Sequence, residues 1–310
     1  MHSRTWLAFL LVGCSGDEAV DDAPSSTGPA ATTPPAPTTP ATTTPVAPTD
    51  SAPPTNPYVD YGAIGPAQVT SSPGTLSLSG CELDYVEYLP DGNASGPLVV
   101  LGHGFQRRAR HVAGLASHVA SHGVRVVTPD YCHSTVFDSD PAANGLDAAA
   151  LAAALAPGEA TVHIGHSAGG LAALFAASSD PAAVAVLGLD PVTTTDEAAD
   201  EALAAQTAAL WALFGEPSSC NADANLLEPL REAGAMLSAL PSANHCDFES
   251  PTDGLCTTFC GDPTGVTPLI AALTTAWAAH HLGTDDAAAA WLPSGSRYEE
   301  LAALGYLVSP

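Results

Sequence analysis

The stretch TVHIGHSAGGLAALFAA, residues 161–177, joins two patterns that predict different elements. Residues 160–165 are β-branched and apolar, which predicts a buried strand, and residues 167–179 are rich in alanine and leucine, which predicts a helix. Between them GHSAG matches the pattern Gly-x-Ser-x-Gly, in which small residues let a tight turn present the serine hydroxyl. The segment therefore predicts a nucleophilic Ser167 at the start of a helix, where backbone N–H groups favour developing negative charge.

Apolar runs and helical runs alternate along the rest of the chain. Strands are predicted over residues 82–89, 97–104, 123–130, 160–165, 183–190, 208–215 and 234–240. Helices are predicted over residues 107–122, 146–156, 167–179, 196–206 and 267–283. This order predicts an α/β fold with a mostly parallel central sheet and helices on both faces. Functional side chains of such sheets lie at the carboxyl ends of the strands.

A serine nucleophile needs a base to take its proton and an acid to orient that base. Asp190 ends the predicted strand that follows the Ser167 helix, and it is the first candidate for the acid. His245 is the first histidine after Ser167, in the loop after the last predicted strand, and it is the candidate base. Glu216 and Asp223 follow the intervening strand and are kept as alternative acids.

Two backbone N–H groups are needed to hold the negative charge that forms on a substrate carbonyl. One should come from Ala168, directly after the nucleophile, and the other from Phe105 in the glycine-rich loop after the second predicted strand. His103 in the same loop precedes the serine, which favours a structural hydrogen bond over a catalytic role. Phe105, His166 and Trp211 are predicted to contact the substrate, and a core position is the alternative for Trp211.

Four segments together resemble the α/β-hydrolase superfamily: HGF (103–105), GHSAGG (165–170), LDPV (189–192) and HCDFE (245–249). The resemblance covers about residues 67–283 and is to the branch of chlorophyllases, platelet-activating-factor acetylhydrolases and cutinase-like polyester hydrolases. The first two groups share the position of the acid at Asp190, whereas polyester hydrolases place it one strand later. The resemblance implies hydrolysis of carboxylic esters without a cofactor, and it does not identify the ester.

The first 57 residues predict export and a tether. Residues 1–14 contain one arginine, a short apolar run and Leu-Val-Gly-Cys, which predicts a signal peptide that ends at a lipidated Cys14. Ser15 follows the cysteine, which favours the outer membrane of a bacterial envelope, and an ordinary secretion signal is the alternative. Residues 15–57 are rich in Pro, Thr, Ala and Ser, which predicts a disordered linker. Residues 58–310 are then the predicted catalytic domain.

Six further cysteines lie in the predicted domain: Cys81, Cys132, Cys220, Cys246, Cys256 and Cys260. An even number behind an export signal predicts disulfides, whose pairing the sequence does not decide. A disulfide from Cys246 to Cys220, Cys256 or Cys260 would fix the loop of the neighbouring His245. Zinc is not favoured, because these cysteines lack the paired spacing of zinc ligands and His118-Val-Ala-Ser-His122 lacks the glutamate of metalloproteases. We therefore expect no metal and no cofactor.

The net charge of −26, with no lysine in the chain, argues against several classes of partner. Nucleic acids and anionic membrane surfaces need a basic footprint, so neither is expected, and membrane contact is expected only through a lipid anchor. We expect a monomeric serine esterase whose partner is a small-molecule, lipid or polymer ester. Two alternatives use the same fold: a non-catalytic envelope lipoprotein that binds a ligand, and an acyltransferase with the same triad.

Overall fold

An eight-stranded sheet forms the centre of residues 58–310, the part of the chain that the computed structural model describes. The strand order is β1 (Val69–Leu78), β2 (Cys81–Pro90), β4 (Arg125–Pro129), β3 (Leu98–Gly102), β7 (Thr161–His166), β8 (Ala183–Leu189), β9 (Ala209–Phe214) and β10 (Met236–Ala239). The pairs β1–β2 and β2–β4 are antiparallel, and the other pairs in this sheet are parallel. The prediction of an α/β fold with a mostly parallel sheet is confirmed, and every predicted strand is present.

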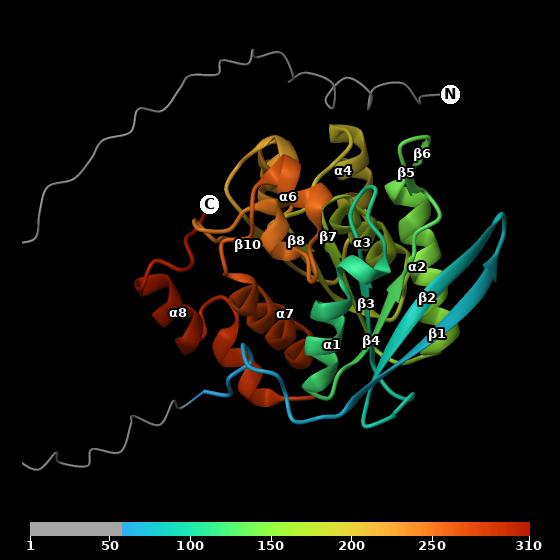
Figure 1. Cartoon of the computed structure of the whole chain (residues 1–310), viewed down its shortest axis with the longest axis horizontal. Helices are drawn as coiled ribbons and strands as arrows, with labels where there is room; N and C mark the ends of the chain where they lie inside the picture. Colours follow the sequence, from blue (N-terminus) through green and yellow to red (C-terminus); the bar gives the residue numbers. More distant parts are fainter. Residues whose placement is uncertain (1–57) are drawn as a thin grey trace, which may run out of the picture. The chain divides into compact units, whose positions relative to one another are not determined.

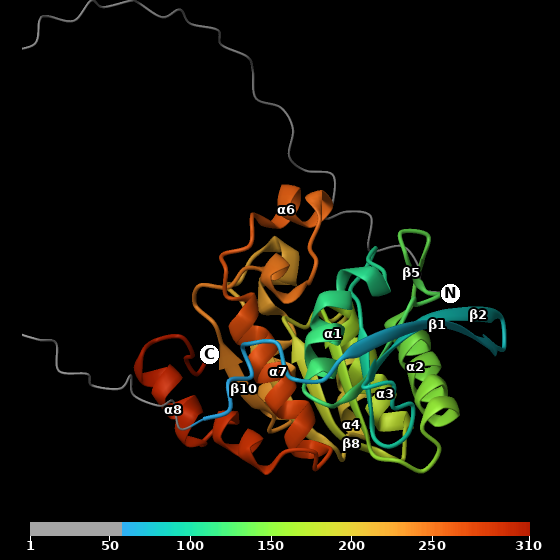
Figure 2. The ribbon, with the colours of Figure 1, turned by 60° about the horizontal axis from the view of Figure 1, so that its bottom comes forward.

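Helices cover both faces of the sheet, as Figure 1 and Figure 2 show. One face carries α1 (Ala113–Ser121) and α7 (Thr267–His281), and the other carries α2 (Pro141–Leu155), α3 (Ala168–Ser179) and α4 (Asp196–Ala204). Strand β3 shows why the strands are apolar on both sides. Val99 and Leu101 join the core beneath α1 and α7, whereas Leu98 and Val100 join the core beneath α2 and α3.

Shorter elements occupy the connections. They are β5 (Ser134–Thr135), β6 (Asp138–Ser139), α5 (Leu227–Glu232), α6 (Gly254–Cys260), α8 (Ser296–Ala303) and the 3-10 helices η2 (Ala109–His111), η3 (Ser219–Ala224), η4 (His245–Phe248) and η5 (Asp286–Trp291). The helix predicted over residues 107–122 begins only at Ala113, because Arg107 enters a buried ion pair with Glu249 and the next residues form the single turn η2. The helix predicted over residues 267–283 is α7, and η5 and α8 follow it unpredicted.

Strand β7 lies between β3 and β8 in the middle of the sheet. These three strands precede the loops of Phe105, Ser167 and Asp190, so parallel pairing brings those loops to one edge. This edge, at the carboxyl ends of the parallel strands, is where α/β sheets carry their sites.

Residues 58–310 all belong to one compact unit. None of the helices in this part of the chain is long and apolar enough to cross a bilayer. The predicted signal peptide, Cys14 and the predicted linker at residues 15–57 lie outside the described residues.

Candidate active site

Ser167 occupies a sharp turn between β7 and α3. Its backbone has φ 57° and ψ −128°, and a strained conformation of this kind costs a residue other than glycine about 1–3 kcal/mol. The Ser167 N–H donates to the Leu189 carbonyl at 3.0 Å, and the Ser167 carbonyl accepts from Gly170 at 2.8 Å and from Val192 at 3.1 Å. The predicted strand-to-helix turn is therefore present, and hydrogen bonds on both sides hold it.

Close packing around this turn requires glycine. A Cβ at Gly165 would overlap the Gly169 carbonyl, and a Cβ at Gly169 would overlap the His103 carbonyl. A Cβ at Gly104 would lie 2.9 Å from the Ser167 Cβ. The loop after β3 therefore approaches the serine directly, which brings together the two segments that carry the predicted oxyanion donors.

Asp190 and His245 form a buried hydrogen bond at the same edge of the sheet. His245 Nδ1 donates to Asp190 Oδ2 at 2.6 Å. Asp190 follows β8, and His245 opens η4 after β10. Because the Nδ1 proton is in this hydrogen bond, Nε2 of the neutral ring is free of a proton and can accept one. The structure thus pairs the predicted base with the first candidate for the acid.

The Asp190 carboxylate is fully buried and has further donors. Gly215 N–H donates to Oδ1 at 3.0 Å, and Asn221 Nδ2 lies 3.1 Å from Oδ1 and 3.2 Å from Oδ2. These bonds satisfy oxygens that water does not reach. The alternative acids Glu216 and Asp223 are exposed, and within residues 58–310 the carboxylate that His245 contacts is that of Asp190.

Phe105 and Ala168 line one recess next to the serine turn, so the structure also brings the two predicted oxyanion donors together. Tyr131 N–H donates to His103 Nε2 at 3.0 Å, and His103 Nδ1–H therefore donates to the Gly104 carbonyl at 2.9 Å. In a trans peptide the carbonyl and the next N–H point in opposite directions, so this bond fixes the direction of the Phe105 N–H. Burial lowers the pKa of His103 to about 4, which keeps the ring neutral near pH 7.

Two residues predicted to contact substrate lie in the interior. Trp211 is fully buried, packs on Trp277 with ring centroids 5.4 Å apart and donates to Ser238 Oγ at 3.0 Å. The structure therefore corrects its predicted place in a substrate cleft, because the ring belongs to the core between β9 and α7. His166 is also buried, with its ring centroid 4.4 Å from that of His245. Burial lowers the pKa of His166 well below its ordinary value, and the nearby positive charge of Arg107 acts in the same direction.

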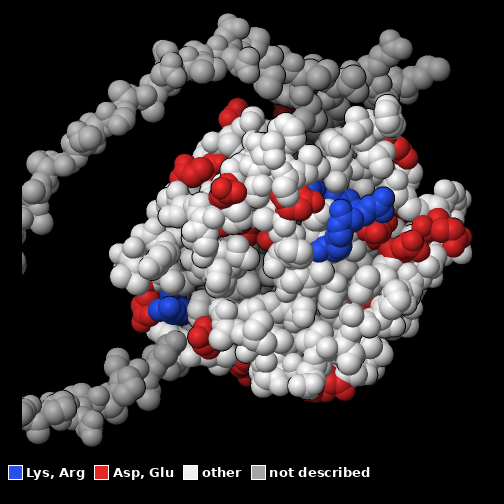
Figure 3. Space-filling view, viewed as in Figure 1, with Lys and Arg blue, Asp and Glu red and all other residues white. Residues whose placement is uncertain are grey.

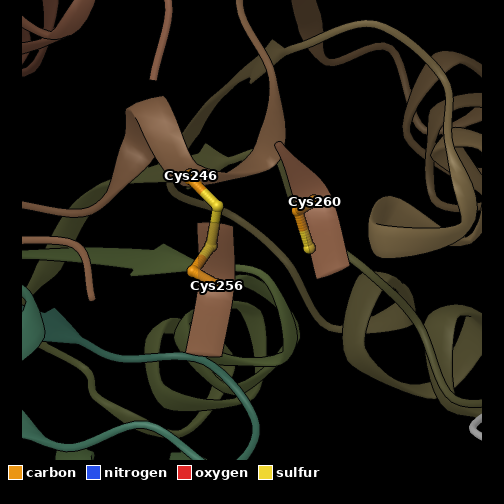
Figure 4. A group of neighbouring side chains, drawn as sticks. All are labelled: Cys246, Cys256 and Cys260. Carbon is orange, nitrogen blue, oxygen red and sulfur yellow. A yellow bond between two sulfur atoms is a disulfide. The ribbon is translucent and has the colours of Figure 1, made fainter. Parts of the chain in front are cut away.

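Two disulfides connect helix α6 to the loop of the candidate base and to the segment of Asn221, which donates to the candidate acid. Cys246, directly after His245, is bonded to Cys256, and Cys220, directly before Asn221, is bonded to Cys260. Cys256 and Cys260 both lie on α6, and Figure 4 shows the bond between Cys246 and Cys256. The prediction that a disulfide holds the His245 loop is confirmed, and its partner is Cys256.

The third disulfide, Cys81–Cys132, joins the start of β2 to the segment after β4. Disulfides thus pair all six cysteines of the described residues. Two groups of side chains have the spacing of a metal site, Cys246–Cys256–Cys260 and Cys81–Cys132–Asp147. Their sulfurs are in disulfides, so they are not thiolate ligands.

Charge at the edge of the site is mostly paired. In Figure 3 acidic side chains are scattered over the surface, and basic side chains gather over the segment that follows β3. That segment contains Arg107, Arg108 and Arg110. Arg107 is buried against Glu249 at 2.6 Å, and Arg108 lies 3.6 Å from Asp130. Two of these three arginines therefore form ion pairs with carboxylates.

No protein-family model matches this chain, and no curated protein matches it either. The sequence pattern locates Ser167, Asp190 and His245, which the structure places at one sheet edge. It does not locate Asn221 or the Arg107–Glu249 ion pair. Arg107 and Glu249 are 142 residues apart in the chain, and no local pattern marks such a contact. The one feature of the sequence that could have pointed to Asn221 is its position directly after Cys220.

Proposed function

We propose that this protein is a serine hydrolase that cleaves carboxylic esters on an α/β-hydrolase fold. The observation that carries the proposal is the buried His245–Asp190 hydrogen bond at the sheet edge where Ser167 occupies its strained turn. Chain order supports it, because Ser167, Asp190 and His245 follow one another in the order of that fold. The recess that Phe105 and Ala168 both line, beside the serine turn, supports the proposal that their N–H groups hold an oxyanion.

In the proposed acylation step, Ser167 Oγ attacks the ester carbonyl and His245 Nε2 takes the serine proton. Asp190 holds the Nδ1–H of His245 and stabilises the imidazolium that forms. The N–H groups of Phe105 and Ala168 donate to the oxygen that becomes negative. The C–O bond then breaks, His245 returns the proton to the leaving alcohol, and an acyl group remains on Ser167.

In the proposed deacylation step, water takes the place of the alcohol. His245 removes a proton from the water as it attacks the acyl carbon, and the same two N–H groups hold the oxyanion. Breaking the bond to Ser167 Oγ releases the carboxylic acid and returns the proton to the serine. All atoms for both steps come from the ester, the water and this chain.

We also propose that the protein is exported and anchored to the bacterial cell envelope through a lipid on Cys14. The support within the described residues is chemical: three disulfides are typical of an oxidising compartment. The support for the anchor itself is the sequence around Cys14.

The test uses the purified protein and its Ser167→Ala variant with p-nitrophenyl esters of graded acyl length. We expect turnover by the wild type and loss of at least about 10³-fold in kcat for the variant. A fluorophosphonate probe should label the wild type at Ser167 and leave the variant unlabelled. The dependence of kcat/KM on acyl length then reports the size of the acyl site.

Each outcome has a distinct meaning. Labelling without turnover would show a working nucleophile and a different ester as substrate. Absence of both labelling and turnover in a folded wild type would contradict the proposal and favour a ligand-binding lipoprotein. Transfer of the acyl group to an added alcohol, seen by product analysis, would favour an acyltransferase.

A further inference from the structure

Arg107 and Glu249 form a buried ion pair between two loops of the candidate site. Arg107 Nε donates to Glu249 Oε1 and Nη2 donates to Oε2, both at 2.6 Å. Arg107 is 8% exposed and Glu249 is 3% exposed. The two parallel hydrogen bonds fix the relative orientation of the two planar groups, which a single contact would not do.

The two ends of this pair lie close in sequence to the groups that the proposed reaction uses. Arg107 is two residues after Phe105, in the loop that carries one oxyanion donor, and Glu249 is four residues after His245. Glu249 Oε1 also lies 3.7 Å from Nδ1 of His166, whose ring packs on the ring of His245. The pair therefore connects the oxyanion loop to the loop of the base.

Neighbouring contacts extend the connection to helix α6. Arg107 Nη2 also donates to Asp253 Oδ1 at 2.9 Å, and His111 Nε2 donates to Asp253 Oδ2 at 2.9 Å. Asp253 accepts the N–H groups of Leu255 and Cys256 at the start of α6. The Cys246–Cys256 disulfide then links α6 to the residue directly after His245.

Stability alone does not account for a buried pair of this kind. Removing two charges from water costs several kcal/mol per ion, and apolar side chains of similar volume are often as stabilising. What an apolar pair does not supply is a fixed orientation between two loops.

We propose that Arg107 and Glu249 are positioning residues that hold the Phe105 N–H and His245 in a fixed mutual geometry. The kinetic part of this inference rests on the proposed function. A displacement of about 1 Å in an active site can reduce a rate about 10²-fold, and loss of one oxyanion donor costs about 10²–10³-fold. Loosening either loop should therefore lower kcat much more than it changes KM.

The test replaces both charged groups at once, with Arg107→Met and Glu249→Leu in one variant. The double replacement avoids leaving one buried charge unpaired, which would cost about 3–5 kcal/mol and endanger folding. The chain contains a matched control in Arg125 and Glu87, where Arg125 Nη2 donates to Glu87 Oε1 at 2.6 Å. Arg125 begins β4, at the opposite end of that strand from the site edge. The control variant carries Arg125→Met and Glu87→Leu.

For esters that the wild type hydrolyses, we expect the Arg107/Glu249 variant to lose about 10–100-fold in kcat with KM changed by no more than about 3-fold. Labelling by the fluorophosphonate should slow by a similar factor, because it needs the same loops. The control variant should retain kcat. Equal losses in both variants, or no loss in the Arg107/Glu249 variant, would overturn the inference.

Hydrogen exchange provides a readout that does not need a substrate. We expect the Arg107/Glu249 variant to exchange amides faster in both residues 103–108 and residues 245–253, and the control variant to leave both loops protected. Unchanged protection in either loop would overturn the inference. If the wild type neither turns over esters nor reacts with the probe, but the Arg107/Glu249 variant still exchanges faster in both loops, the proposed function is removed and the connection between the loops stands.

Discussion

A histidine–carboxylate pair lies near each end of strand β7, and the two pairs have different surroundings. At the amino end, His163 Nε2 donates to Asp180 Oδ2 at 2.9 Å, and the Thr161 hydroxyl donates to the same oxygen at 2.6 Å. At the carboxyl end, Ser167 follows the strand and His245 Nδ1 donates to Asp190. Both ends thus have a hydroxyl, an imidazole and a carboxylate, which are the side chains of a catalytic triad.

The arrangement of the three groups distinguishes the two ends. The Thr161 hydroxyl donates its hydrogen bond to the carboxylate and not to the histidine, and Thr161 and His163 both lie within the regular strand. At the other end the Ser167 backbone has a positive φ, and the histidine comes from a separate loop. A recess lined by Phe105 and Ala168 adjoins this serine. The two ends have the same residue types, so residue types alone do not mark a candidate nucleophile, and the positive φ of Ser167 and the neighbouring recess distinguish the carboxyl end.

The largest expected difference between the two ends concerns activity. Asp190→Asn should reduce kcat about 10⁴-fold, because an amide N–H would hold His245 in the tautomer whose Nε2 cannot take a proton. Asp180→Asn makes the same chemical change at the amino end and should leave kcat within about 3-fold of wild type. Steady-state kinetics of both variants on the same ester measures the contrast. Comparable losses in both would show that the carboxyl end has no special role.

The disulfides give the next largest effects, and they separate stability from activity. By loop entropy, Cys81–Cys132 should contribute about 4 kcal/mol and Cys246–Cys256 about 3 kcal/mol, because the first closes a longer loop. Paired Cys→Ser variants should therefore lower Tm more for the first disulfide than for the second. Activity should follow the opposite order, with a loss of about 10–100-fold only for the Cys246–Cys256 variant, which frees the His245 loop.

Thermal unfolding and kcat measured on the same two variants check this reversal. If the Cys81–Cys132 variant loses more activity as well as more Tm, the Cys246–Cys256 disulfide stabilises the fold and has no specific role in holding His245. Reduction of the wild type is a less selective form of the same experiment, because it opens all three disulfides together.

Local sequence patterns predict those strands and helices whose own residues have a strong apolar pattern. Strand β3 is such an element, because it is buried along its whole length and has a continuous apolar run. Strand β1 is not predicted, because its VTSSPGTLSL sequence has little strand preference and its place depends on pairing with β2. Local preference is a weak guide where tertiary contacts decide the element.

The same division applies to the site. Ser167, Asp190 and His245 each follow a predicted strand, so a parallel topology is enough to bring them to one edge of the sheet. Asn221 and the Arg107–Glu249 pair depend on how loops fold over the sheet edge, which periodicity does not encode. Trp211 is predicted to contact the substrate but lies in the core. The sequence could not decide between these places, because an aromatic residue near a strand end occurs in both cores and clefts.

The His163–Asp180 pair should affect how the free energy of unfolding depends on pH. Burial acts to raise the pKa of Asp180, but hydrogen bonds from His163 and Thr161 outweigh it, and the pKa is lowered from 3.8. A carboxyl whose folded pKa lies below its unfolded value stabilises the fold above the unfolded pKa, near pH 4, and loses that contribution as pH falls towards the folded value.

Asp180→Asn should therefore lower the free energy of unfolding by about 2 kcal/mol at pH 6, where the carboxylate accepts its hydrogen bonds. The difference from wild type should shrink as the pH is lowered below 4, because protonation removes the same contribution from the wild type. Urea unfolding of both proteins from pH 6 down to pH 2.5 measures it. A difference that stays constant over this range would show that the charge of Asp180 contributes nothing.

The smallest effect tests the backbone contrast itself, with one substitution made at each end of β7. Ser167→Gly should raise the free energy of unfolding by about 1 kcal/mol, because glycine adopts a φ of 57° without the strain that serine stores there. Thr161→Gly should lower it by at least about 1 kcal/mol, because the strand loses a β-branched residue and the Asp180 carboxylate loses a donor. Chemical denaturation of the two variants gives the signs directly. If Ser167→Gly also destabilises the protein, the backbone of the Ser167 turn is not strained. Any cost of the candidate site in free energy of unfolding must then come from burial of the Asp190 carboxylate.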